Sequence, residues 1–203
     1  MFSLRAKYSN SSQAVLDKYG NEKITEIKVM RTPLPNILQN LMNYFSSGKS
    51  KAVYDDLFHL CLLVTVESGK VILVEKNEEI DISLESKIES NSQVKNVSLQ
   101  GKTLTLNEML NKTQKAMGTS NYFTYNALSL NCQNFVINIL KTNGLLTEDI
   151  YKFTYQDMTQ LIKSTPKVYQ KFIQFVTNSK AWLNKVVGSS GKKKCGRTKK
   201  IPK

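Results

Sequence analysis

The sequence holds a single histidine, His59, and only three cysteines, Cys61, Cys132 and Cys195, among its 203 residues. One histidine excludes a three-histidine zinc site and a two-histidine facial triad built within one chain. Three scattered cysteines argue against a disulfide framework, so we expect an intracellular, reducing compartment. Neither a metal ion nor a cofactor is predicted.

Long apolar runs are missing as well. No stretch approaches the ~20 residues that a membrane-spanning helix needs. The first residues, MFSLRAKYSNSSQ, also lack the apolar stretch of a signal peptide, so export by that route is not expected. Apolar residues still make up 40% of the chain, and a chain of this length buries a core without disulfides. We expect one globular domain over residues 1–187.

Acidic residues are few: 16 Asp and Glu stand against 29 Lys and Arg, which gives a net charge of +13. Residues 188–203 hold seven of the basic residues and no acidic one, which predicts a disordered tail. Its basic side chains include Lys192, Lys193, Lys194, Arg197, Lys199 and Lys200. Such a tail is attracted to phosphates of nucleic acid, to an anionic membrane surface or to an acidic partner. The alternative is a tail that only aids solubility.

Hydrophobic periodicity predicts an α+β domain, with an antiparallel β-sheet packed against helices. Apolar alternation and short apolar runs predict strands at residues 24–31, 57–66, 71–75, 80–84 and 94–99. Helical spacing predicts helices at residues 11–19, from 36 onward, and at 104–117, 131–141, 154–163 and 167–187. Asn10, Ser11 or Ser12 is expected to cap the first helix, and Gly20 to end it. We place the core at about residues 57–141 and a helical C-terminal extension at about 147–187.

Cys132 stands at the start of a predicted helix, directly after a short loop. The unpaired N–H groups and partial positive charge of a helix N-terminus favour the thiolate, which is the reactive form of cysteine. The alternative is a small buried residue that fills a contact between helix and sheet. Cys132 is therefore a candidate nucleophile.

His59 lies inside a predicted apolar strand, where a lone histidine is more often a core residue than a catalyst. A cysteine at a helix start beside a histidine on a sheet is nevertheless the arrangement of a papain-like thiol site. There the imidazole takes the thiol proton and later returns it to the leaving group. Cys61 shares a strand face with His59 and is either a second thiol of the site or, as we favour, a core residue.

The segment Tyr125–Val136, YNALSLNCQNFV, resembles the nucleophile motif of the lecithin:retinol acyltransferase-like proteins, a circularly permuted branch of the NlpC-like, papain-related thiol hydrolases. The resemblance rests on a tyrosine seven residues before the cysteine, followed by Asn-Cys, two polar residues and Phe-Val. It covers roughly residues 57–141. In that branch the histidine precedes the cysteine on an earlier strand, as His59 precedes Cys132. The resemblance implies a permuted papain-like core, to which the C-terminal helices predicted from the helical spacing are extra.

The chain departs from that branch in two places. Gln133 and Asn134 follow the cysteine where the branch often has Glu-His, and no second histidine is available as a third polar group. Glu75 or Asn77, across the predicted hairpin, is the alternative group to orient His59, or Glu75 is simply a solvated charge at a strand end. The hydroxyl of Tyr125 is expected either to help stabilise an oxyanion beside the Cys132 N–H or to pack under the loop.

These features predict a cysteine hydrolase or acyltransferase that acts through an acyl-Cys132 intermediate. The resemblance implies a lipid acyl ester as substrate, as for a phospholipase, with an amide or isopeptide bond, as for a cysteine protease, as the nearest competitor. The alternative is a catalytically inactive NlpC-like scaffold, for example a virion-associated protein. The chain is rich in Lys, Asn and Ile, and the resemblance extends to thiol-hydrolase-like proteins of large DNA viruses. A viral protein of the virion or host cytoplasm is therefore a hypothesis.

Overall fold

The computed structural model describes residues 7–33, 58–84, 91–126 and 129–156. The helices expected from residue 36 and at 167–187, residues 157–163 of a third, and the basic tail lie outside these ranges. The described part is an α+β fold with an antiparallel sheet and helices, which confirms the predicted fold class at that level.

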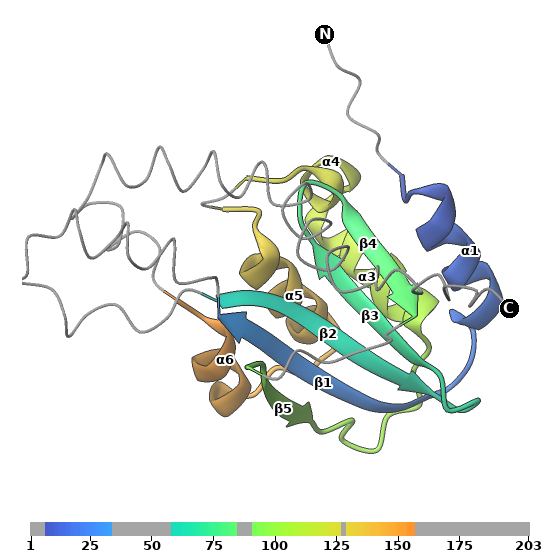
Figure 1. Cartoon of the computed structure of the whole chain (residues 1–203), viewed down its shortest axis with the longest axis horizontal. Coiled ribbons are helices and arrows are strands. Elements are labelled where there is room, and N and C mark those ends of the chain that lie inside the picture. The colour runs from blue at the N-terminus through green and yellow to red at the C-terminus, as the bar shows by residue number, and fades with distance from the viewer. Residues whose placement is uncertain (1–6, 34–57, 85–90, 127–128, 157–203) are drawn as a thin grey trace, which may run out of the picture.

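Five strands form one sheet in the order β4-β3-β2-β1-β5, with every neighbouring pair antiparallel. The strands are β1 (Ile24–Pro33), β2 (Phe58–Val66), β3 (Val71–Lys76), β4 (Ile80–Leu84) and β5 (Gln93–Val97). All five predicted strands are thus present, with ends shifted by a few residues. β1 reaches Pro33 and pairs with β2 along its length, so β1 and β2 form the centre of the sheet (Figure 1).

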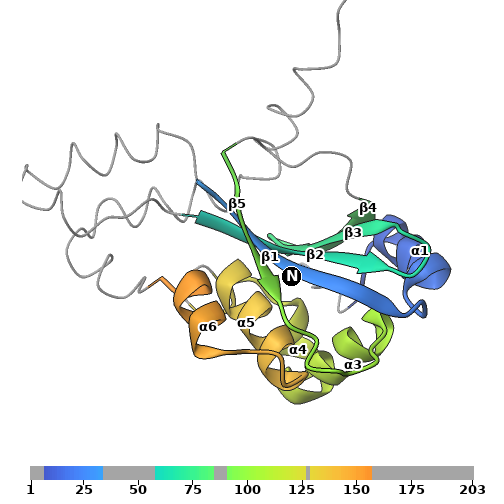
Figure 2. The ribbon, with the colours of Figure 1, turned by 90° about the horizontal axis from the view of Figure 1, so that it is seen from below.

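The helices are α1 (Asn10–Tyr19), α3 (Leu106–Met117), α4 (Thr119–Phe123), α5 (Cys132–Thr142) and α6 (Glu148–Thr154). Figure 2 shows α3, α4, α5 and α6 together on one side of the sheet, while α1 lies at its β4 edge. The backbone N–H of Ile82 in β4 donates to the buried Ser12 hydroxyl of α1, which attaches this helix to the edge strand.

The main core lies between the sheet and the helix layer. It is built from alternate strand residues on one side and apolar helix residues on the other. Representative members are Ile27, Val29, Leu62, Val64, Ile72, Val74, Met109, Leu110, Phe135, Val136 and Ile139. The opposite sheet face carries a smaller buried cluster of Met30, Cys61 and Leu63. Cys61 is 2% exposed and its thiol faces the Met30 carbonyl oxygen, so it is a core residue, as we favoured.

Two helix ends differ from the sequence prediction. The N-cap of α1 is Ser9, one residue before the predicted candidates, because its hydroxyl accepts the N–H of Ser12. The prediction that a helix starts at Thr154 is wrong, because α6 ends at Thr154 and the backbone of Tyr155 is extended. Thr147 caps α6 through the N–H of Ile150, so α6 precedes the predicted range and falls at the start of the expected helical extension from about residue 147.

A lysine side chain is buried in the fold, which the sequence did not predict. Lys76 at the end of β3 is only 1% exposed, and its amine donates to the backbone carbonyls of Asn121 and Tyr122. These carbonyls belong to the last turn of α4, where a cation is favourable. Burial lowers the pKa of Lys76 to about 8. The sequence pattern of β3 alone gave no sign of this contact.

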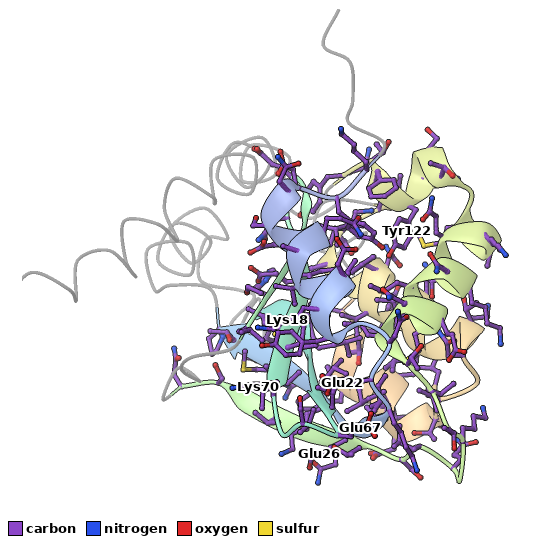
Figure 3. All side chains as sticks on the ribbon, turned by 90° about the vertical axis from the view of Figure 1, so that its right-hand side faces the viewer. Lys18, Glu22, Glu26, Glu67, Lys70 and Tyr122 are labelled. Atoms are coloured by element: carbon purple, nitrogen blue, oxygen red, sulfur yellow. The ribbon has the colours of Figure 1, made fainter. Side chains whose placement is uncertain are left out.

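Charged side chains gather at the other end of the central strands. Glu22, Glu26 and Glu67 lie together near the β2–β3 hairpin, away from Tyr122 (Figure 3). Glu22 accepts the backbone N–H of Ser68 in that hairpin turn. This acidic group is therefore at the far end of β2 from His59. Among the described residues, no helix has the length and apolar character needed to cross a membrane.

Candidate active site

Cys132 is the first residue of α5. Asn131 caps the helix, because its side-chain oxygen accepts the backbone N–H of Asn134 at 3.0 Å. The apolar side of the helix, with Phe135 and Val136, packs into the core below β2 and β3. The cap ends the preceding loop at Asn131, so the cysteine stands where the first backbone N–H groups of the helix are free to meet an anion.

His59 is the second residue of β2. Its Nε2 lies 2.7 Å from Oε2 of Glu75 on β3. The two side chains are 20% and 15% exposed, so the contact is mostly shielded from water. Since Glu75 occupies Nε2, the other ring nitrogen remains for the thiol. A carboxylate in this position holds the ring orientation and stabilises the imidazolium.

The register of the hairpin explains why Glu75 rather than Asn77 bonds the imidazole. β2 and β3 pair with Thr65 opposite Val71 and Cys61 opposite Glu75, around a three-residue loop. If this register is extended two residues beyond Cys61, His59 stands opposite Asn77. Glu75 is then the diagonal neighbour of His59 on the same face. The diagonal carboxylate is long enough to reach the ring. Of the two alternatives left open by the sequence, Glu75 makes the hydrogen bond.

The Cys132 side chain meets the His59 ring in a hydrogen bond. Burial alone would raise the pKa of the Cys132 thiol, but the hydrogen bond and positive charge of His59 lower it below its ordinary value. The backbone N–H groups of Leu60 and Gln133 also bond the sulfur and act in the same direction. The sulfur therefore receives donors from both the strand and the helix.

The imidazole responds in the complementary direction. Burial alone would lower the pKa of His59, but the hydrogen bonds to Cys132 and Glu75 and their negative charges raise it to about 10. A lowered thiol pKa and a raised imidazole pKa both favour a thiolate–imidazolium ion pair. Perturbed groups of this kind concentrate at functional sites, although structural ion pairs also produce them.

Tyr125 is half-buried, and the charge of Cys132 acts on its phenol. Burial, followed by the negative charges of Cys132 and Glu78, raises the pKa of its phenol above the ordinary value. Tyr125 therefore keeps its proton at neutral pH and is available as a donor close to the sulfur. This nearness is compatible with both predicted roles, oxyanion donor and packing residue.

The site also contains groups that the sequence analysis did not single out. These are the N–H of Leu60 and the side chains of Gln133 and Gln156, which bond each other. A motif scan has no signal for Gln156, since it lies outside the nucleophile motif and approaches Gln133 only in the folded chain. Among the described residues, no group of three His, Cys, Asp or Glu side chains is placed to hold a metal ion.

Comparison of the chain with protein-family models, with curated proteins and with solved structures gives no match. The resemblance to the acyltransferase-like branch therefore rests on the residues of the motif alone. The geometry of Cys132, His59 and Glu75 is the main observation that bears on function.

Proposed function

We propose that the chain is a papain-like cysteine hydrolase or acyltransferase with a permuted core, in which Cys132 is the nucleophile and His59 the general acid and base. The observation that carries the proposal is the continuous contact from the Cys132 thiol through the His59 imidazole to the Glu75 carboxylate. Nucleophile, base and orienting group are the three parts that thiol catalysis requires.

The first half of the reaction forms an acyl-enzyme. The Cys132 thiolate attacks the acyl carbonyl carbon, and the new S–C bond places negative charge on the carbonyl oxygen. The backbone N–H of Cys132 at the start of α5 and the Tyr125 hydroxyl are the proposed donors to that oxygen. The tetrahedral intermediate collapses by breaking the bond to the leaving group, which takes the proton of the His59 imidazolium.

The second half releases the acyl group. Neutral His59 takes a proton from water or from an acceptor, and the oxygen or nitrogen of that molecule attacks the thioester carbon. The C–S bond breaks and Cys132 returns as the thiolate beside the imidazolium. The Glu75 side chain orients the ring throughout. A lipid acyl ester is the proposed substrate class, and an amide or isopeptide bond is the second.

The test compares Cys132 with Cys61 in the full chain. Iodoacetamide labelling of Cys132 should be far faster than labelling of the buried Cys61, with a pH midpoint well below the ~8.5 of an ordinary thiol. A p-nitrophenyl acyl ester should release a burst of nitrophenol and leave the acyl mass on Cys132. Cys132→Ser should fold normally and lose both signals.

Equal and slow labelling of Cys132 and Cys61 would contradict the enzyme proposal. The inactive scaffold would then be the better description of the fold, with binding through the basic tail as its function. Unchanged ester turnover in Cys132→Ser would instead show that the nucleophile lies elsewhere.

A further inference from the structure

Two glutamine side chains pair directly behind the candidate site. Gln133, the residue after Cys132, is 5% exposed, and Gln156 follows the end of α6. The Gln133 Nε2 donates to Oε1 of Gln156 at 3.3 Å, and the backbone N–H of Gln156 donates to Oε1 of Gln133 at 2.9 Å. The two residues therefore bond each other reciprocally.

A third hydrogen bond connects this pair to the strand that carries the imidazole. The backbone N–H of Phe58, the residue before His59, donates to the same Oε1 of Gln156 at 3.2 Å. One side-chain oxygen thus accepts from the residue that follows the sulfur and from the residue that precedes the imidazole. We call Gln133 and Gln156 the glutamine clamp.

We propose that the glutamine clamp is a positioning device for the Cys132–His59 pair: it holds the start of α5 against the start of β2, so that the sulfur meets both of its backbone donors. The inference rests on the proposed function. The side chains of Gln133 and Gln156 contact neither the Cys132 sulfur nor the His59 ring nitrogens in these bonds. Their proposed role is therefore to position the reacting groups.

The geometry around the sulfur explains why such a clamp matters. The donors to Cys132 are the N–H of Gln133 on α5 and the N–H of Leu60 on β2, next to the imidazole of His59. The β2–β3 ladder ends at Cys61 and Glu75, so β3 does not pair with β2 at Leu60. A hydrogen bond weakens steeply with distance and angle, so a small separation of α5 from β2 would weaken several bonds at once.

A purely structural role is the competing explanation for the bonds between Gln133 and Gln156. A buried glutamine needs hydrogen-bond partners wherever it lies, because an unpaired polar group costs about 1–3 kcal/mol. A structural pair would change the stability of the fold when it is removed. A positioning pair would, in addition, change the ionisation of Cys132 in the folded protein, and this difference can be measured.

The experiment measures the pH profile of iodoacetamide labelling at Cys132 in the full chain, by mass spectrometry of the labelled peptides. The variants are Gln156→Met, Gln133→Met and the double variant. We expect each single variant to raise the pH midpoint by about one unit, which slows labelling about ten-fold at pH values below the wild-type midpoint. Because the two side chains act as one unit, the double variant should be no slower than either single variant.

Two controls separate positioning from general loosening. Gln114→Met removes a hydrogen bond from Nε2 of Gln114 to the Thr119 hydroxyl, between α3 and α4, and should leave the Cys132 profile unchanged. Cys61 serves as an internal reporter, since it is 2% exposed and labels only when the fold opens. Its labelling rate should be the same in the clamp variants and the wild type. If the buried Gln133→Met does not fold, the half-buried Gln156→Met decides alone.

Three results would overturn the clamp. The first is a Gln156→Met variant whose Cys132 labelling profile equals that of the wild type. The second is a double variant in which the two single slowings of Cys132 labelling multiply. The third is a clamp variant in which Cys61 labelling becomes faster while the Cys132 profile changes. All three leave the proposed function standing, provided that wild-type Cys132 is activated. If wild-type Cys132 itself titrates near ~8.5, the proposed function and the clamp are both wrong.

Discussion

At the scale of single residues, His59 has to satisfy two anions at once. Its ring lies between the Cys132 sulfur and the Glu75 carboxylate, and both raise its pKa against the effect of burial. A positive ring between two negative groups leaves the trio with one net negative charge. Glu75 therefore determines how strongly the imidazolium stabilises the thiolate.

Replacing Glu75 tests this dependence. In Glu75→Gln, the His59 pKa should fall, because the ring loses a charged partner but keeps a hydrogen-bond acceptor. The Cys132 thiolate then loses part of its counter-charge, so its labelling midpoint should rise by about one unit, which slows labelling about ten-fold at pH values below the wild-type midpoint. Glu26→Gln, which removes a carboxylate paired with Lys28 at the other end of the sheet, is the matched control. Identical profiles for the two variants would contradict the role of Glu75.

At the scale of elements, the site lies where one strand and one helix begin. β2 begins at Phe58 and supplies the imidazole and the Leu60 N–H, while α5 begins at Cys132 and supplies the sulfur and the Gln133 N–H. Neither element is sufficient by itself. The Asn131 cap matters because it decides at which residue the first turn of α5 starts.

Asn131→Ala should lower the free energy of unfolding by about 1 kcal/mol, because the N–H of Asn134 loses its acceptor. It should also slow Cys132 labelling, since a frayed first turn no longer holds the Gln133 N–H on the sulfur. Thr147→Ala removes the corresponding cap of α6 and should cost a similar amount of stability. Urea unfolding and labelling of both variants check this. Equal labelling would show that the cap stabilises the helix without serving the site.

At the scale of the whole molecule, the site links stability to pH. The His59 pKa is raised from 6.5 to about 10 in the folded state, so this residue contributes stability that is fully present below pH 6.5. The contribution is lost as the pH rises through about 10. Because the lowered pKa of Cys132 changes stability in the opposite direction, the comparison is made in a Cys132→Ser background. There, the excess stability of the chain with His59 over the chain with His59→Gln should shrink as the pH rises above 6.5. Urea midpoints of both proteins at several pH values measure it, and a constant difference would contradict the raised pKa.

The charge of the whole chain is positive, and residues 188–203 carry seven basic residues. If this segment binds phosphates, its removal should weaken binding to duplex DNA or anionic vesicles at low salt and reduce the slope of affinity against salt. A chain truncated after Val187, compared with the full chain by titration at two salt concentrations, tests this. Equal, salt-insensitive binding by both chains would leave the tail as a solubilising segment.

Features that depend on neighbouring residues could be predicted from the chain alone. Alternation in residues 24–31 and 71–75 predicted strands, and the Asn131-Cys132 step predicted a helix start with a thiol on it. The five-stranded antiparallel sheet and α5 confirm these expectations. Such features follow from local periodicity and capping, which a linear pattern contains.

The contacts between distant side chains, by contrast, could not be predicted and became visible in the folded protein. The choice of Glu75 over Asn77 depended on a three-residue hairpin loop, since one residue more or less moves every cross-strand neighbour. The burial of Lys76 depended on where the last turn of α4 lies, and the pairing of Gln133 with Gln156 on where the chain passes after α6. These contacts join segments distant in sequence, and long-range packing leaves no periodic signal in the chain itself.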